Sequence, residues 1–191
     1  MFTYCLNSPV NRFDPMGEDA IWIQEEGSAG SFGHSGLLVQ NAKGEWFFFY
    51  WGAKPGASAV EMVTGTEAMM VFVKVDTNGL DMKNGNHIRK ALKQTDKYFG
   101  DDPRSGKVTD LYYFEGDYSK THKHLQNMYD SPIKEQYSVI YRNCLQQTRK
   151  ALAKSNIAIP LMTTSVIPNL AYKELFIWNE LLDEIRVVYI S

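Results

Sequence analysis

The sequence predicts an α+β domain in which an antiparallel sheet packs against helices. Three observations support this fold class: short apolar runs bounded by glycine and other turn residues, a hairpin pattern over residues 34–51, and helical spacing of apolar residues in segments such as 86–99. The chain has 191 residues, which is enough for one domain with a sizeable core, and it contains no internal repeat.

Short apolar runs predict the strands. Outside the hairpin, these runs are residues 20–24, 58–63, 69–75, 110–116 and 186–190. In the hairpin, the turn-forming residues Gln-Asn-Ala-Lys-Gly join two apolar runs that lie between Gly33 and Gly52. The second run, residues 46–51, is apolar on both faces, so we expect this strand to be central and covered on both sides.

Helical spacing and capping residues predict the helices. The first helix is residues 86–99, and the second contains Tyr118, Leu125, Met128 and Tyr129 and stops before Pro132. The third runs from Cys144 to Ser155, and the fourth is residues 169–185. The third helix follows an extended run, residues 137–141. Asn143 is a preferred N-cap, so Cys144 should take the first helical position.

Composition argues against several function classes. The chain has 20 basic and 22 acidic residues, which gives no electrostatic case for nucleic acid or an anionic membrane as the main partner. No run approaches the roughly 18 apolar residues of a membrane span, so we expect no stable membrane insertion. The N-terminus lacks a signal-peptide layout, so if the protein leaves its cell, a carrier would have to export it. Cys5 and Cys144 form neither a disulfide framework nor a zinc site, and we expect no metal and no cofactor.

Cys144 is the candidate nucleophile. At a helix N-terminus, backbone N–H groups and the positive end of the helix dipole favour the thiolate. A nucleophilic thiolate also needs a base, and His34 is the best placed histidine because it opens a strand after a glycine-rich loop. His122 and His124 lie on a lysine-rich helix, and His87 lies in the first turn of another. The competing interpretation is that the cysteine is a small buried hydrophobic residue.

A family resemblance supports this pair. The segment FGHSGLLVQ, residues 32–40, followed by YRNCLQQTRKAL, residues 141–152, resembles the circularly permuted branch of the NlpC-type papain-like cysteine hydrolases, which includes the lecithin:retinol acyltransferase-like proteins. In that branch the histidine comes first, on a strand, and the cysteine later, at a helix start. The resemblance implies a papain-like fold with Cys144 as the nucleophile and His34 as the general base.

The resemblance also implies a third polar residue, on the strand after the histidine strand. Glu45, near the turn, and Tyr50, at the far end of the strand, are both candidates, and a dyad helped by a backbone carbonyl is a further alternative. The sequence does not choose, because a slip of one residue in register moves every side chain to the other face. Oxyanion or positioning roles fall to Asn143, Tyr137 and Tyr141.

The start of the chain carries a second resemblance. The segment YCLNSPVNRFDPMG, residues 4–17, resembles the motif YxLNNPVNxxDPxG, which closes the core of Rhs-repeat proteins before a C-terminal toxin. The processing junction would be marked by Pro9, Asp14, Pro15 and Gly17. Residues 1–17 would then be the remnant of the core junction, and residues 18–191 a single papain-like effector domain. In that family a hydrophobic residue often follows the glycine, whereas this chain has Glu18. The sequence therefore does not decide whether cleavage at the junction occurs.

Together the resemblances imply a polymorphic toxin domain that is a cysteine-dependent hydrolase or acyl transferase acting on an amide or ester bond, as a peptidase, amidase or deamidase does. An Rhs carrier would deliver it into target cells, and a dedicated immunity protein would cover the cleft between His34 and Cys144. Two alternatives stay open: a toxin acting on nucleic acid or a nucleotide, and a non-catalytic binding tail. The zinc-deaminase pattern is missing, which weakens the first.

Overall fold

The computed structural model describes residues 18–26, 33–131, 136–155 and 187–190. Its strands are β1 (Ala20–Glu25), β2 (His34–Gln40), β3 (Trp46–Ala53), β4 (Thr66–Lys74), β5 (Asp110–Phe114), β6 (Gln136–Tyr137) and β7 (Val187–Ile190). These described strands form a seven-stranded sheet in the order β6-β4-β3-β2-β1-β5-β7, and each pair of neighbours is antiparallel. The prediction of an antiparallel sheet is confirmed.

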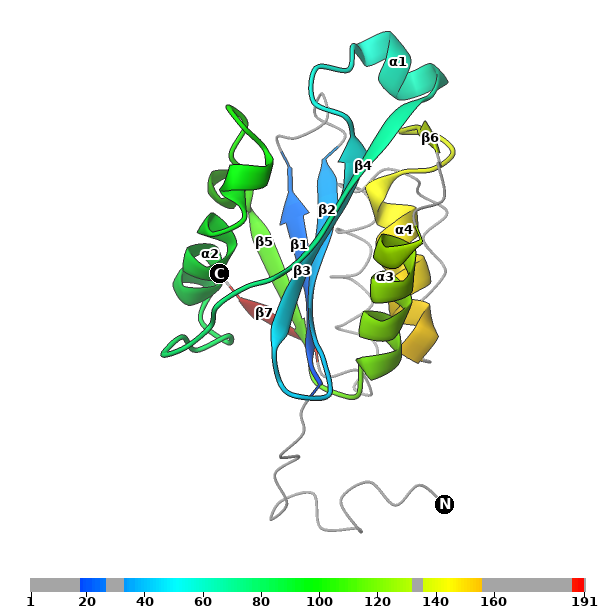
Figure 1. Ribbon diagram of the computed structural model, residues 1–191. Coiled ribbons are helices and arrows are strands. Elements are labelled where there is room, and N and C mark those ends of the chain that lie inside the picture. Colours follow the sequence, from blue (N-terminus) through cyan, green and yellow to red (C-terminus); the bar gives the residue numbers. More distant parts are fainter. Residues whose placement is uncertain (1–17, 27–32, 132–135, 156–186, 191) are drawn as a thin grey trace.

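Helices cover both faces of this sheet, so the predicted α+β class is confirmed (Figure 1). The α-helices of the described residues are α1 (Ala59–Thr64), α2 (Gly85–Lys93), α3 (Ser119–Asp130) and α4 (Cys144–Leu152). Short 3-10 helices are η3 (Asp96–Tyr98), η4 (Ser105–Lys107) and η5 (Ala153–Ser155). Helix α2 lies on one face, whereas α3 and α4 lie side by side on the other.

The hairpin of β2 and β3 forms as predicted, with Gln40 opposite Trp46. Backbone hydrogen bonds close its turn, and one side chain reinforces it: Asn41 Oδ1 accepts hydrogen bonds from the backbone N–H groups of Lys43 and Glu45 at 2.9 and 3.0 Å. Gly44 supplies the positive φ of 73° that the turn needs. This turn fixes the register of β3 on β2, and therefore decides which residues of β3 reach the start of β2.

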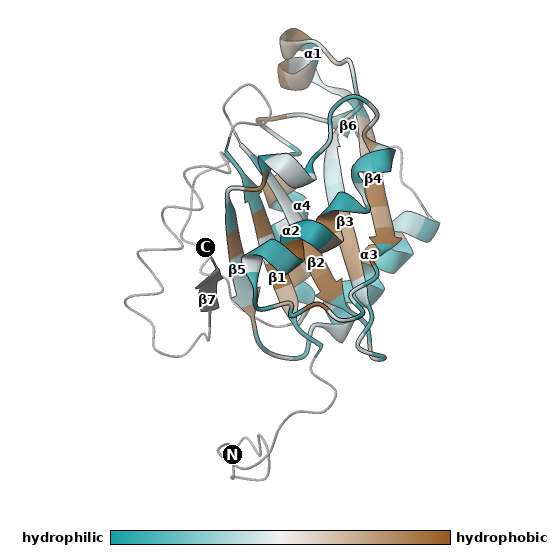
Figure 2. Ribbon diagram, turned by 90° about the vertical axis from the view of Figure 1, so that its left-hand side faces the viewer, coloured by the Kyte–Doolittle hydropathy of each residue, from teal (hydrophilic) through white to brown (hydrophobic). Residues whose placement is uncertain are grey.

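Strand β3 is covered on both faces, as its apolar run predicts. Phe49 and Trp51 pack on the α3–α4 side with Leu145 of α4, whereas Phe48 and Tyr50 pack on the α2 side. Figure 2 shows α2 lying across the strands on that second side. Two apolar layers therefore hold the sheet between the helices, and burial on this scale is the main source of its stability.

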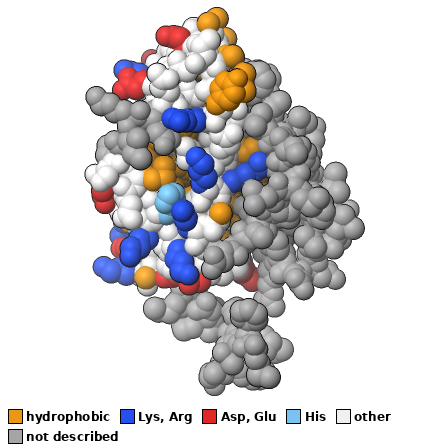
Figure 3. Space-filling view, turned by 90° about the vertical axis from the view of Figure 1, so that its right-hand side faces the viewer, with side chains coloured by type: hydrophobic (Ala, Val, Ile, Leu, Met, Phe, Trp, Pro, Cys, Tyr) orange, Lys and Arg blue, Asp and Glu red, His pale blue; other side chains and the backbone are white. Residues whose placement is uncertain are grey.

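The outer side of the α3–α4 layer is basic. Lys and Arg side chains gather on this face (Figure 3). The exposed lysines on or next to these helices are Lys120, Lys123, Lys150 and Lys154. Solvated charge on the outside and apolar side chains toward the sheet are the pattern expected of amphipathic helices on a core. No helix in the described ranges combines the length and the apolar content that crossing a membrane requires.

Three of the predicted elements differ in the structure. Residues 58–63, predicted as a strand, begin helix α1 instead, because Ser58 and Glu61 form a capping box. The helix predicted over residues 86–99 ends at Lys93 and continues as η3. The run 137–141, predicted as extended, contains the end of β6 and then a turn closed by a bridge between residues 138 and 142.

The remaining strands, at residues 20–24, 69–75 and 110–116, are confirmed with small shifts in their bounds, and so is the last strand, β7. The predicted helix at residues 169–185 lies outside the described residues. So do residues 1–17, which include the four predicted junction residues Pro9, Asp14, Pro15 and Gly17.

Candidate active site

Cys144 occupies the first position of α4, as predicted. Asn143 is the N-cap, and its side-chain oxygen accepts the Gln146 backbone N–H at 3.0 Å. The amide nitrogen of Asn143 donates to the Val139 carbonyl at 2.7 Å, which ties the preceding turn to the helix start. Asn143 therefore positions the cysteine by capping its helix.

The thiol of Cys144 lies against the backbone at the start of β2. Its sulfur accepts a hydrogen bond from the Ser35 N–H at 3.4 Å. Pairing of β2 with β3 starts at Leu37, which leaves this N–H available to the sulfur. Since Ser35 N is bonded to the His34 carbonyl carbon, the sulfur lies within about 6 Å of the His34 Cα. The fold thus brings Cys144 beside the strand residue that the sequence analysis selected, 110 positions earlier in the chain.

The Cys144 thiol and the His34 imidazole are both neutral near pH 7. Burial raises the pKa of the Cys144 thiol to about 11, although the N–H groups of Ser35 and Leu145 act in the opposite direction. The sequence led us to expect a favoured thiolate, but desolvation of the fully buried sulfur outweighs the helix N-terminus. Burial also lowers the pKa of His34 well below its usual value, and the positive charge of Arg104 adds to this. A neutral imidazole of this kind can accept a proton from the thiol.

His34 is held by stacking. Its ring lies on the Tyr50 ring, with centroids 4.4 Å apart and planes inclined by 24°. Nε2 of His34 is buried and has no hydrogen-bond partner in the part of the chain that the structure describes. His34 faces the α2 side of the sheet together with Tyr50, whereas Cys144 comes from the α4 side. The two residues therefore approach the end of the sheet from opposite faces.

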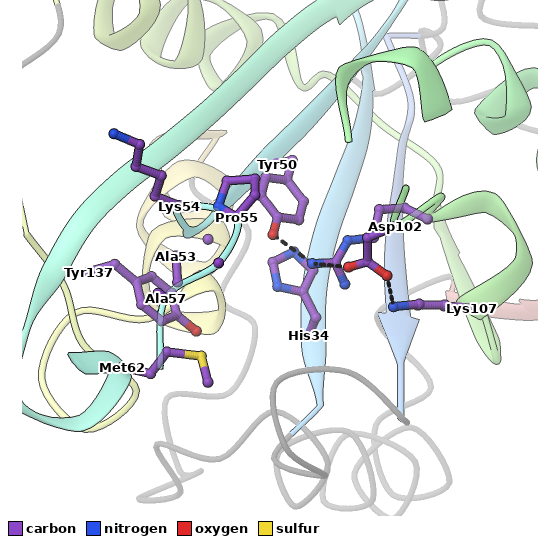
Figure 4. Close-up of a pocket in the computed structure, with 13 residues that line it drawn as sticks. His34, Tyr50, Ala53, Lys54, Pro55, Ala57, Met62, Asp102, Lys107 and Tyr137 are labelled. Atoms are coloured by element: carbon purple, nitrogen blue, oxygen red, sulfur yellow. Dashed lines mark hydrogen bonds and ion pairs between the residues drawn. The ribbon is translucent and has the colours of Figure 1, made fainter. Parts of the chain in front are cut away.

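A pocket of about 250 Å³ opens at this end of the sheet. His34, Tyr50, Met62, Arg104 and Tyr137 are among the residues that line it. Figure 4 shows the His34 ring beside Tyr50, and Tyr137 across the pocket from both. Cys144 itself is fully buried and interacts with the Tyr137 hydroxyl; burial and this contact raise the pKa of Tyr137. Tyr137 therefore lies between the thiol and the pocket, at one of the positions predicted for an oxyanion donor.

Two further residues of the site, Glu25 and Arg104, were not predicted from the sequence. Glu25 is the direct cross-strand partner of His34, is 2% exposed, and places Oε2 3.0 Å from Arg104 Nη1. Arg104 comes from the loop before η4, and its Nη2 lies 2.9 Å from the Tyr50 hydroxyl. The register of β1 on β2 would have identified Glu25, but no local signal in the sequence fixes that register.

Glu45, a candidate third catalytic residue, and Tyr141, a candidate oxyanion or positioning residue, both lie away from the His34 site. Glu45 follows the hairpin turn at the opposite end of β2, where it pairs with Lys74 at 2.6 Å and accepts a hydrogen bond from Asn41. Tyr141 is 76% exposed. The structure therefore does not bring Glu45 to the histidine or Tyr141 into the pocket lining, and of the two proposed third residues only Tyr50 contacts the His34 ring.

Replacing Glu45 with glutamine should leave the reactivity of Cys144 unchanged. The carboxylate is exposed, and its partners are Lys74 and Asn41 at the hairpin turn. An exposed ion pair of this kind contributes little to stability. The rate of Cys144 alkylation by iodoacetamide checks this expectation, and a large loss of rate would show that Glu45 acts on His34 after all.

Acid should destabilise the protein through His34. The pKa of the buried imidazole is lowered from 6.5, so below that pH the unfolded state binds more protons than the folded state does. The free energy of unfolding should therefore fall as the pH drops, by up to about 1.4 kcal/mol for each unit of pKa shift. Urea denaturation at several pH values should give a shallower acid slope for His34→Gln, and equal slopes would contradict the buried neutral imidazole.

The surroundings of the site hold no obvious metal centre. Within the described ranges, no three or more His, Cys, Asp or Glu side chains are grouped so that they could hold an ion. Cys144 is a free thiol. Comparison of the chain with protein-family models, with curated proteins and with solved structures finds no match. The function must therefore be argued from the residues of the site.

Proposed function

We propose that this domain is a cysteine-dependent hydrolase or acyl transferase that acts on an amide or ester carbonyl, on a papain-like fold of the permuted NlpC type. One observation carries the proposal: the Cys144 sulfur, at the N-terminus of a helix packed on the sheet, is bound to the backbone N–H that directly follows His34. A thiol and a neutral imidazole that the fold brings to one end of the sheet, the imidazole in the lining of the pocket and the thiol behind Tyr137, are the components of thiol catalysis.

The reaction begins with a neutral pair. The pKa of about 11 leaves almost no thiolate near neutral pH, so the Cys144 sulfur attacks the carbonyl carbon as its proton passes to the His34 imidazole. Because the two side chains start on opposite faces of the sheet, the imidazole has to reach the thiol around the end of β2. The oxyanion accepts hydrogen bonds from the Cys144 backbone N–H and the Tyr137 hydroxyl. His34 then gives the proton to the departing amine or alcohol, and a thioester remains on the sulfur. Water or another acceptor, deprotonated by His34, releases the acyl group.

The pocket favours a small acyl group. Its volume of about 250 Å³ lies just below the range of roughly 300–1,000 Å³ typical of small-molecule sites. A side-chain amide or the end of a peptide fits such a space more readily than a bulky substrate does. Movement of Tyr137 is required first, because this residue separates the buried thiol from the pocket.

The biological role we propose is that of a polymorphic toxin, carried by an Rhs protein and secreted or injected into target cells through that carrier. The support comes from the junction motif at residues 4–17. A producing cell then needs a cognate immunity protein, for which the pocket mouth beside His34 and Tyr137 is the binding site to test.

Growth of a bacterial host tests the function. The full chain is expressed in the cytoplasm and, separately, exported to the periplasm, as wild type, as Cys144→Ala and as the control Tyr141→Phe, which changes an exposed residue. We expect the wild type and the control to inhibit growth and Cys144→Ala to be harmless. Inhibition by Cys144→Ala equal to that of the wild type would contradict thiol catalysis and favour a toxin acting on nucleic acid. No inhibition in either compartment would contradict a bacterial target.

A further inference from the structure

We propose that Tyr50, Arg104 and Glu25 are positioning residues that together hold the His34 imidazole, in place of a hydrogen-bonded third catalytic residue. The inference rests on the proposed function of Cys144 and His34. It follows from side-chain contacts that link His34 to Tyr50, Tyr50 to Arg104 and Arg104 to Glu25, and from the backbone pairing of Glu25 with His34 across β1 and β2.

The first contact fixes the plane of the imidazole. The Tyr50 ring stacks on His34 at 4.4 Å, and the histidine side chain is almost completely buried. Nε2 of His34 has no hydrogen-bond partner among the described residues. Among the described residues, stacking on Tyr50 is a contact that restrains the plane of the ring, and it leaves Nε2 able to exchange a proton.

The second set of contacts fixes Tyr50. Its hydroxyl is 2.9 Å from Arg104 Nη2, and the ring meets Phe99 edge to face with centroids 4.8 Å apart. The phenol lies over Gly52, where a Cβ would come within 2.2 Å of the hydroxyl oxygen. A glycine at this position is what allows the ring to lie along β3 toward the start of β2.

The third set of contacts fixes Arg104. Nη1 pairs with the buried Glu25 carboxylate at 3.0 Å, and the guanidinium lies over the rings of Tyr50 and Phe99. The Arg104 backbone N–H donates to Asp96 Oδ1 at 2.9 Å, which holds the loop itself. Glu25 in turn lies beside the histidine in the sheet, because its backbone is paired with that of His34 across β1 and β2.

The charged groups around His34 differ in their burial. The Arg104 guanidinium and the Glu25 carboxylate are the buried pair, and Asp102, Lys107 and Lys54 line the more exposed part of the pocket. After burial, the positive charge of Arg104 is the second factor that disfavours the imidazolium form of His34. Loss of the guanidinium should therefore change both the orientation and the proton affinity of His34, which a purely structural residue would not do.

Two measurements test the inference on the full chain. The first is the rate of Cys144 alkylation by iodoacetamide. The second is the set of imidazole ¹⁵N signals of His34, recorded as a function of pH. These signals are also recorded in the Cys144→Ala background, where no thiol chemistry can contribute to them. The variants are Tyr50→Phe, which keeps the ring and removes the bond to Arg104, Tyr50→Leu, Arg104→Gln and Arg104→Lys. Tyr98→Phe, at a half-exposed tyrosine of η3, is the control.

We expect Tyr50→Leu and Arg104→Gln to slow alkylation by about tenfold or more, since a general base that is misplaced loses most of its effect. Arg104→Lys should recover part of the rate. In Tyr50→Leu the His34 signals should show averaging between tautomers, and in Arg104→Gln the His34 pKa should rise. Tyr50→Phe should keep the ring signals and lose part of the rate, and Tyr98→Phe should match the wild type.

The outcomes separate the two proposals. Unchanged His34 signals in Tyr50→Leu and in both Arg104 variants would overturn the positioning role, whatever the alkylation rates. A second outcome is that the variants alter the His34 signals, while Cys144 alkylation is as fast in His34→Gln as in the wild type. This outcome would support the positioning role and contradict the proposed function. Since Arg104→Lys changes little volume, its His34 signals test the inference even if the more disruptive variants fail to fold.

Discussion

Replacing Arg104 with methionine should lower the free energy of unfolding by about 3–5 kcal/mol, because the change leaves the Glu25 carboxylate buried without this counter-charge. The two side chains are 15% and 3% exposed, and their charged atoms lie 3.0 Å apart. The same change removes the Arg104 bond to the Tyr50 hydroxyl. Urea denaturation, followed by circular dichroism, measures the loss.

The exposed pair of Lys54 and Glu67 provides the matched control, since its side chains are 62% and 72% exposed. Lys54→Met should leave the urea midpoint nearly unchanged because water screens such a pair. The double variant Glu25→Leu with Arg104→Met should recover much of the lost stability, because it removes both buried charges. Equal and small effects of Arg104→Met and Lys54→Met would contradict a desolvated ion pair at the site.

Replacing Gly52 with alanine should destabilise the protein by about 3 kcal/mol, at the upper end of the usual cost of overpacking. The new Cβ would lie 2.2 Å from the Tyr50 hydroxyl oxygen and 2.5 Å from its Cζ. The Tyr50 ring cannot yield easily, because it is only 3% exposed and is packed between His34 and Phe99. Thermal unfolding measures the effect, and Cys144 alkylation should slow in parallel.

Gly106→Ala is the matched control for this change. Gly106 lies in the neighbouring short helix η4, and a Cβ added there meets no atom within 4 Å. We expect its melting temperature to stay close to that of the wild type. A similar melting temperature for Gly52→Ala would mean that the Tyr50 ring moves freely, and it would remove the basis for stacking as the device that orients His34.

Much of the fold could be predicted because its signals are local. The hairpin over residues 34–51 has a turn and two apolar runs, and the all-apolar run of β3 indicates burial on both faces. Helix α1 was missed because its apolar residues resemble a strand, whereas the Ser58–Glu61 capping box decides the structure. Capping chemistry here outweighs the β-propensity of the two valines.

The candidate site also contains residues that local sequence signals predict and residues that they do not. Asn143 and Cys144 could be located from a capping rule that acts within four residues. Glu25 and Arg104 could not, because their proximity to His34 depends on strand register and on a loop 70 residues away from the histidine. The protonation of Cys144 was also beyond the sequence, because the helix start is visible there and the complete burial of the sulfur is not.

The most direct test of the central claim is the pH dependence of Cys144 acylation by p-nitrophenyl acetate, followed by p-nitrophenol release and by peptide mass analysis, in the wild type and in His34→Gln. If His34 takes the thiol proton, the wild type reacts rapidly near neutral pH, whereas His34→Gln is slow there and accelerates only as the pH approaches the thiol pKa of about 11. The two curves then converge in alkali. Superimposable curves across the whole range would contradict the account, because Cys144 would then react without help from His34.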